Sequence, residues 1–185
     1  MTDRMALITM LAARSTKRGE FTLTSGKVSK YYIDARLTTM SPEGLSLIGS
    51  LGLAVLKQSG WQMDAIGGLT LGADPISYAI SYASAASSNP LRAFTVRKET
   101  KTHGTGKTIE GPFREGDRVA VVEDVITTGG SALKAIEAVR AENGTVVGVL
   151  ALVDREEGGK QVIEAAGIPV ISLATASEVI EALKN

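Results

Sequence analysis

Short apolar runs alternate with amphipathic stretches from about residue 60 to the end of the chain. Five runs predict strands, at residues 65–69, 93–96, 119–122, 146–153 and 169–173. Most of these runs lack alternating polar residues, which is typical of strands that are buried on both faces of a sheet.

Apolar residues at helical spacing lie between the predicted strands. Such stripes are Ile76, Ile80 and Ala83, then Ala132, Ile136 and Val139, with shorter ones at 162–166 and 179–183. The alternation of strand and helix predicts an α/β fold, in which helices flank a mostly parallel central sheet and the crossovers are right-handed.

The first 60 residues follow a different pattern. A helix is predicted near residues 5–13, and a polar stretch at 15–30 separates it from a strand-like segment at 31–34. Pro42 then opens an apolar helix. We expect one domain over residues 1–185, in which residues 1 to about 60 contribute a small N-terminal hood on the sheet.

Composition excludes several classes of function. The 185 residues carry 20 basic and 20 acidic side chains and no cysteine. Disulfide scaffolds, cysteine zinc sites and thiol catalysis are therefore ruled out, and zero net charge argues against general nucleic-acid binding. The longest apolar run is eight residues, whereas a membrane span needs about twenty. A cytoplasmic protein is expected.

Residues 98–116 form a long segment with four glycines and little apolar periodicity. Segments of this kind are uncommon in compact domains and are usually lids, binding loops or disordered stretches. Because this one is basic, a plain surface loop is the less favoured interpretation.

The most informative segment is residues 119–131. A hydrophobic strand runs into two adjacent carboxylates, Glu123 and Asp124, and a turn of hydroxyls and glycines leads into a helix. Ligands of parallel sheets bind at the carboxyl ends of strands, and a helix N-terminus suits a phosphate. Carboxylates accept hydrogen bonds from sugar hydroxyls, so the pattern indicates a ribose 5-phosphate. Helix capping by Ser131 alone would not require the acid pair.

Residues 121–131 resemble the phosphoribosyl diphosphate (PRPP) signature of type I phosphoribosyltransferases, which implies the fold of that family. The resemblance implies that residues 127–131 hold the 5-phosphate, that Glu123 and Asp124 hold the ribose hydroxyls, and that Asp124 is catalytic. The PRPP-binding residues implied in this segment are Glu123, Asp124, Val125, Ile126, Thr127, Thr128, Gly129, Gly130 and Ser131.

Three further segments resemble the orotate phosphoribosyltransferases within that family: 97–104, 21–34 and 154–155. This resemblance implies a pentosyltransferase of pyrimidine biosynthesis. It transfers ribose 5-phosphate from PRPP to N1 of orotate and forms orotidine 5′-phosphate and diphosphate. Mg²⁺ is implied as cofactor, held mainly by PRPP and without direct protein ligands.

The resemblance implies that residues 98–116 form a flexible catalytic lid. Positive charges on and beside this lid stabilise the leaving diphosphate, which gains negative charge as its bond to the sugar breaks. The resemblance assigns Arg97, Lys98, Lys101 and His103 to PRPP, and Lys101 and His103 also to catalysis. A lone histidine has a structural alternative. In the family the lid serves the neighbouring subunit, which implies a homodimer.

Arg155 and Thr127 are implied to bind orotate, whose carboxylate suits a guanidinium; the alternative for Arg155 is an ion pair with neighbouring acids. Backbone groups of Tyr32 and Ile33 are further candidates. Some relatives carry a lysine where Thr24 stands, and others carry one within the region that corresponds to 67–75, where this chain has none. Lys27 is a candidate substitute.

Two other functions remain open from the sequence. The first is a phosphoribosyltransferase for a different base. The second is a regulatory module that binds the sugar phosphate without catalysis. Turnover of orotate, uracil and purines distinguishes them.

Overall fold

The computed structural model describes residues 2–22, 26, 28–98 and 108–184. Its central sheet has the order β5-β4-β3-β6-β7-β8. Every neighbouring pair is parallel except β4 and β5. The strands are β3 (Ala65–Leu69), β4 (Arg92–Val96), β5 (Ile109–Glu110), β6 (Arg118–Ile126), β7 (Thr145–Asp154) and β8 (Val170–Thr175). The predicted α/β fold with a mostly parallel sheet is confirmed.

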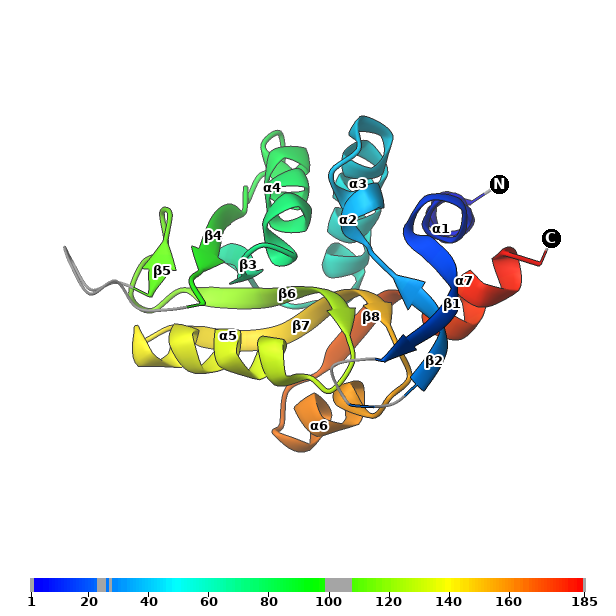
Figure 1. Cartoon of the computed structure of the whole chain (residues 1–185). Coiled ribbons are helices and arrows are strands. Elements are labelled where there is room, and N and C mark those ends of the chain that lie inside the picture. Colours follow the sequence, from blue (N-terminus) through cyan, green and yellow to red (C-terminus); the bar gives the residue numbers. More distant parts are fainter. Residues whose placement is uncertain (1, 23–25, 27, 99–107, 185) are drawn as a thin grey trace.

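Helices cover both faces of this sheet (Figure 1). One face carries α5 (Gly130–Ala141) and α6 (Gly159–Ala165), and the other carries α3 (Pro42–Gln58) and α4 (Ala73–Ser84). Successive residues of a strand point to opposite faces, so Val121 packs in the cluster beneath α5 while Val122 packs beneath α3 and α4. The unbroken apolar runs of the sequence are thus explained by burial on both sides.

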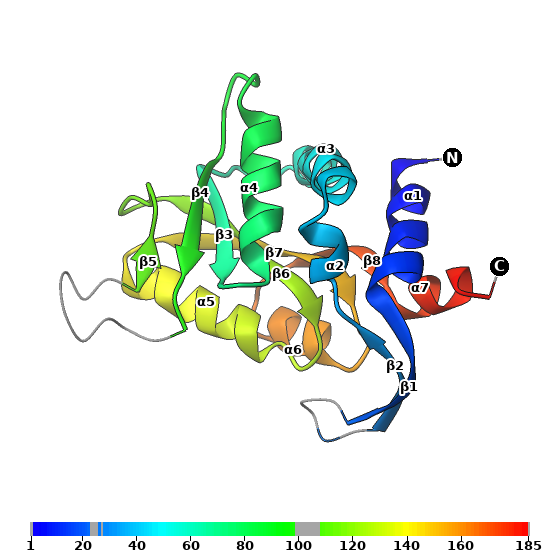
Figure 2. The ribbon, with the colours of Figure 1, turned by 45° about the horizontal axis from the view of Figure 1, so that its top comes forward.

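The hood is built from α1 (Asp3–Met10), a π-helical turn at Leu11–Ser15, the hairpin β1 (Thr16–Thr22) and β2 (Val28–Ile33), and α2 (Arg36–Thr39). Figure 2 shows the hairpin apart from the central sheet, with α1 beside α7 (Ala176–Ala182). Leu7 and Leu11 are fully buried and belong to the same core cluster as Ile48 of α3.

The polar stretch predicted at 15–30 contains a strand, which corrects the sequence interpretation. Most side chains of β1 are exposed, so no apolar alternation marks it. The strand is held by pairing with β2 and by a ring contact between Phe21 and Tyr32 at 5.5 Å. Pairing between two segments, rather than burial, therefore decides this element.

Strand β6 continues four residues beyond the apolar run that predicted it. Glu123 pairs with Ala151 and Val125 with Val153 of β7, so the acid pair lies within the strand and is held by the ladder. Acidic residues are depleted in strands, which is why the pattern ended at Val122.

A short strand also lies within the segment expected to form a lid. Ile109 and Glu110 pair with Val96 and Thr95, while residues 99–107 lie outside the described part of the chain. Among the helices that the structure describes, none is both long and apolar enough to cross a membrane.

Candidate active site

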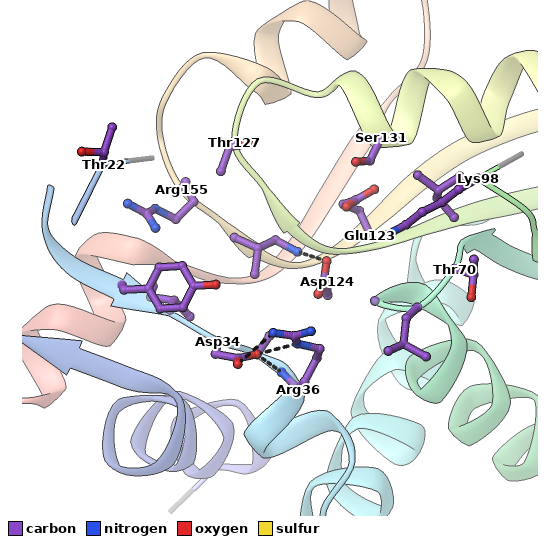
Figure 3. A pocket seen from close by; sticks show the side chains of 17 residues that line it. Thr22, Asp34, Arg36, Thr70, Lys98, Glu123, Asp124, Thr127, Ser131 and Arg155 are labelled. Atoms are coloured by element: carbon purple, nitrogen blue, oxygen red, sulfur yellow. Dashed lines mark hydrogen bonds and ion pairs between the residues drawn. The ribbon is translucent and has the colours of Figure 1, made fainter. Parts of the chain in front are cut away.

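A cavity of about 530 Å³ opens at the carboxyl ends of β3, β6 and β7, beneath the hood. Six segments of the chain contribute to its lining: Thr22, residues 32–36 of the hood, residues 69–72 at the end of β3, Lys98 after β4, the end of β6 with the start of α5, and Arg155 after β7. Figure 3 shows their side chains converging on Asp124. The parallel sheet thus gathers segments that are distant in sequence at one edge.

Glu123 and Asp124 both line this cavity. The Oδ1 atom of Asp124 accepts a hydrogen bond from the backbone N–H of Val125 at 2.9 Å. Burial, and then the charge and hydrogen bond of Asp124, raise the pKa of Glu123 to about 8. Among the described residues neither carboxyl group forms an ion pair.

Gly72 packs directly against the carboxyl group of Asp124. A Cβ atom at residue 72 would lie 2.5 Å from the Asp124 carboxyl carbon, closer than real Cβ contacts. The peptide bond between Thr70 and Leu71 is cis. The turn between β3 and α4 forms one wall of the cavity, and a side chain at residue 72 would displace the Asp124 carboxyl group.

A hydrogen-bond network anchors this wall. The Asp74 carboxylate accepts hydrogen bonds from Thr70 Oγ1 at 2.6 Å and from Thr95 Oγ1 at 2.8 Å. Tyr78 Oη lies 2.7 Å from Thr95 Oγ1, and the Thr70 N–H donates to the Val96 carbonyl. This network was not predicted from the sequence; the available signal was Asp74, an acidic residue directly before a proline in the first turn of α4.

The N-terminus of α5 forms the corner predicted to hold a phosphate. Gly129 precedes the helix with φ +83°, a conformation that favours glycine. Within the described chain no side chain caps α5, so its first N–H groups are free to bind an anion. Thr127 and Ser131 line the cavity, and the Thr127 carbonyl accepts a hydrogen bond from the Gly159 N–H at 3.0 Å.

The other residues of the signature are placed differently. Val125 lines the cavity, whereas the side chain of Ile126 is buried in the core. Thr128 and Gly130 are exposed and lie outside the cavity lining. Their contribution to a ligand would come from the backbone of the corner.

Arg155 is almost fully buried, with 8% of its side chain exposed, at one end of the cavity. Its Nη2 atom lies 3.0 Å from Glu157 Oε1 and 3.4 Å from Ser29 Oγ. The ion pair with a neighbouring acid is thus present, while Arg155 also lines the cavity together with Tyr32 and Ile33; orotate binding stays a prediction.

The basic candidates before the lid differ in position. Lys98 lines the cavity, whereas Arg97 lies outside its lining and pairs with Glu110 of β5 at 2.7 Å. Lys101 and His103 lie outside the described residues, as do Thr24 and Lys27.

Two charged residues of the hood, Asp34 and Arg36, also line the cavity and form an ion pair at 2.8 Å. The sequence analysis placed Asp34 at the end of a strand without assigning it a role, and it missed Arg36. The signal was their position directly after that strand.

We predict that Glu123→Gln stabilises the protein at pH 8 and changes little near pH 5. In the folded protein the Glu123 carboxyl group keeps its proton up to about pH 8, whereas in the unfolded chain it loses the proton near its ordinary pKa of 4.5. Between these values the wild-type free energy of unfolding falls as pH rises. Glutamine does not ionise, so the variant does not lose this stability. At pH 8 its free energy of unfolding should exceed that of wild type by on the order of 1–3 kcal/mol.

Urea unfolding at pH 5, 6.5 and 8 measures this difference. Glu137→Gln is the control, because Glu137 is an exposed residue of α5. Parallel stability curves for wild type and Glu123→Gln across the three pH values would contradict the assignment.

Comparison with known proteins agrees with this geometry. Residues 54–168 match the family model of the phosphoribosyl transferase domain. The orotate phosphoribosyltransferase of Aquifex aeolicus is 50% identical over 183 residues, which cover 97% of this chain and 99% of that protein.

Solved structures agree as well. The Mycobacterium tuberculosis orotate phosphoribosyltransferase in complex with Fe(III) dicitrate superposes with a TM-score of 0.83 at 41% identity, covering 96% of this chain and 99% of that one. The same enzyme in complex with PRPP gives a TM-score of 0.77 at 36% identity, covering 96% and 91%. With a domain match over more than half of its length and 50% identity to a relative over nearly the full chain, this chain belongs to the orotate phosphoribosyltransferase family.

Proposed function

We propose that this protein transfers ribose 5-phosphate from PRPP to N1 of orotate, which forms orotidine 5′-phosphate and diphosphate for pyrimidine biosynthesis. One observation carries the proposal: an uncapped helix N-terminus, an acid pair and a buried arginine line a single cavity. These groups match a phosphate, a sugar diol and a carboxylate-bearing base. The M. tuberculosis relative solved in complex with PRPP supports the choice of donor.

Each end of the cavity has a separate task in this reaction. The N–H groups of α5 with Thr127 and Ser131 bind the 5-phosphate, and Glu123 with Asp124 accepts hydrogen bonds from the ribose hydroxyls. Arg155 faces the orotate carboxylate. As the bond from the anomeric carbon to diphosphate breaks, positive charge grows on the sugar ring, and the Asp124 carboxylate stabilises it.

Mg²⁺ fits this site through oxygen ligands. The described residues contain no group of three or more His, Cys, Asp or Glu side chains that could hold a metal ion. Mg²⁺ commonly keeps several waters and binds through one or two carboxylates together with substrate phosphates. We propose that PRPP would hold Mg²⁺ mainly through its own oxygen atoms, and that the bound ion would supply positive charge beside the diphosphate.

Turnover with a panel of bases tests the proposal. The protein is incubated with PRPP, Mg²⁺ and, in turn, orotate, uracil, adenine and hypoxanthine. We expect loss of the orotate absorbance and no nucleotide from the other bases. Turnover of another base instead would identify a different phosphoribosyltransferase, and PRPP binding without any turnover would identify a regulatory module.

We further propose a homodimer in which residues 98–116 of one subunit act at the site of the other. Three apolar side chains support an association surface beside the cavity. Leu37, Met40 and Leu71 are each about half exposed and line one shallow hollow that also includes Arg36. Exposed apolar patches commonly mark association surfaces. The cytoplasmic location stays a prediction.

Mixing two inactive variants tests the shared site. If the lid acts across the interface, Lys101→Ala mixed with Asp124→Asn forms heterodimers in which one of the two sites has both residues intact. An equal mixture should then recover about a quarter of wild-type activity. No recovery, once heterodimers are confirmed by mass spectrometry, would contradict sharing.

A further inference from the structure

Arg36 is held in one orientation by Asp34. Asp34 Oδ1 accepts from Arg36 Nε at 2.8 Å and from the Arg36 backbone N–H at 3.2 Å, while Oδ2 accepts from Nη2 at 3.0 Å. A guanidinium has five N–H donors, and two are used here. Three donors therefore remain on a planar group whose orientation is already set, which is the arrangement that suits phosphate oxygens.

The paired guanidinium lies at the cavity. Arg36 lines it together with Asp124 and Gly72, and it also lines the adjoining hollow beside Leu71. The hydrogen bonds and charge of Asp34, and to a smaller extent the charge of Asp124, raise the pKa of Arg36 above its usual value. Figure 3 shows Arg36 below Asp124, with Glu123 and Ser131 above it.

The other walls of the cavity are already assigned. The α5 corner takes the 5-phosphate, the acid pair takes the diol, and Arg155 at the far end takes the base. The diphosphate on the anomeric carbon is left facing the turn after β3 and the start of α2. Residues 67–75 of that turn contain no lysine or arginine, so this wall has no cation of its own.

We propose that Arg36 binds the diphosphate of PRPP, with Asp34 as the residue that positions it. The assignment rests on the proposed function for the identity of the donor. It deepens that function by naming the hood as the source of a diphosphate-binding cation.

Calorimetric titration with two ligands tests the proposal, because each ligand carries one part of PRPP. Arg36→Ala should weaken binding of inorganic pyrophosphate with Mg²⁺ about tenfold, as expected for loss of a charge-assisted hydrogen bond. Binding of ribose 5-phosphate, which lacks the diphosphate, should change by less than about twofold. Arg36→Lys keeps the positive charge but lacks the planar set of guanidinium N–H donors, so its pyrophosphate affinity should lie between those of wild type and Arg36→Ala.

Arg118→Ala is the matched control. Arg118 forms the same kind of fork with Asp64, at 3.0 and 3.1 Å, and its side chain is 48% exposed, as is that of Arg36. It lies at the start of β6, the opposite end of that strand from the cavity. This variant should bind both ligands as wild type does. Circular dichroism and sizing confirm that every variant keeps its fold and oligomeric state.

Two results would overturn the proposal: unchanged binding of inorganic pyrophosphate by Arg36→Ala, or equal weakening of pyrophosphate and ribose 5-phosphate binding. Neither ligand contains a base, so a selective loss of pyrophosphate binding would stand even if the base panel identified a substrate other than orotate. Wild-type protein that bound neither ligand would overturn both proposals.

Discussion

Gly72→Ala is expected to lower kcat/KM for PRPP about hundredfold, because displacement of a reacting group by about 1 Å costs that much. The new Cβ atom would fall 2.5 Å from the Asp124 carboxyl carbon. The Asp124 carboxyl group must then turn away from the position at which we propose that it meets the ribose. Steady-state kinetics with varied PRPP measures the loss.

A double-mutant cycle shows whether the effect passes through Asp124. Asp124→Ala removes the carboxyl group that the new methyl would displace, so adding Gly72→Ala to that variant should change kcat/KM little. Losses that multiply independently would mean that Gly72 acts on the turn itself. Thermal unfolding of each variant accounts for any change in stability.

If Arg155 binds the orotate carboxylate as we propose, Arg155→Met is expected to raise the KM for orotate about hundredfold, because it removes a buried charged partner. The same variant should lose about 3 kcal/mol of unfolding free energy, since it leaves the Glu157 carboxylate buried without its partner. Glu157 is 15% exposed, and its Oε2 atom already has no hydrogen-bond partner among the described residues.

A second variant separates the two effects. Arg155→Met combined with Glu157→Gln removes both charges, so the free energy of unfolding should return most of the way to the wild-type value. Orotate binding should stay weak. Urea unfolding and initial rates measure the two quantities, and recovery of orotate affinity in the double variant would contradict a direct role for Arg155.

Much of the sheet was predictable, because a strand buried on both faces consists of a continuous run of apolar residues that is visible in the sequence. Strand β3 has the predicted bounds, and the other runs predict β4, β6, β7 and β8 to within a few residues. The hairpin of the hood was not predictable in the same way. Its first strand is exposed, so its sequence carries no apolar pattern, and only pairing with β2 sets its conformation.

The residues of the candidate site likewise fall into two groups, one predictable from the sequence and one not. The acids, hydroxyls and glycines of 123–131 are contiguous, so a single stretch of sequence indicates their chemistry. Arg36 and Gly72 belong to other segments, and nothing beside them in the chain predicts a contact with Asp34 or Asp124. They acquire a role only because the hood and the turn after β3 meet at Asp124.

By itself, the sequence determined the strand–helix alternation, the hydroxyl- and glycine-rich corner before α5 and the acid pair, because each is encoded by neighbouring residues. Only the tertiary structure decided that Asp34 orients Arg36 at the cavity, that Gly72 closes against Asp124, and that Arg155 contacts both Glu157 and Ser29. These contacts depend on how separate segments pack and on where their side chains point. Local periodicity does not record that information.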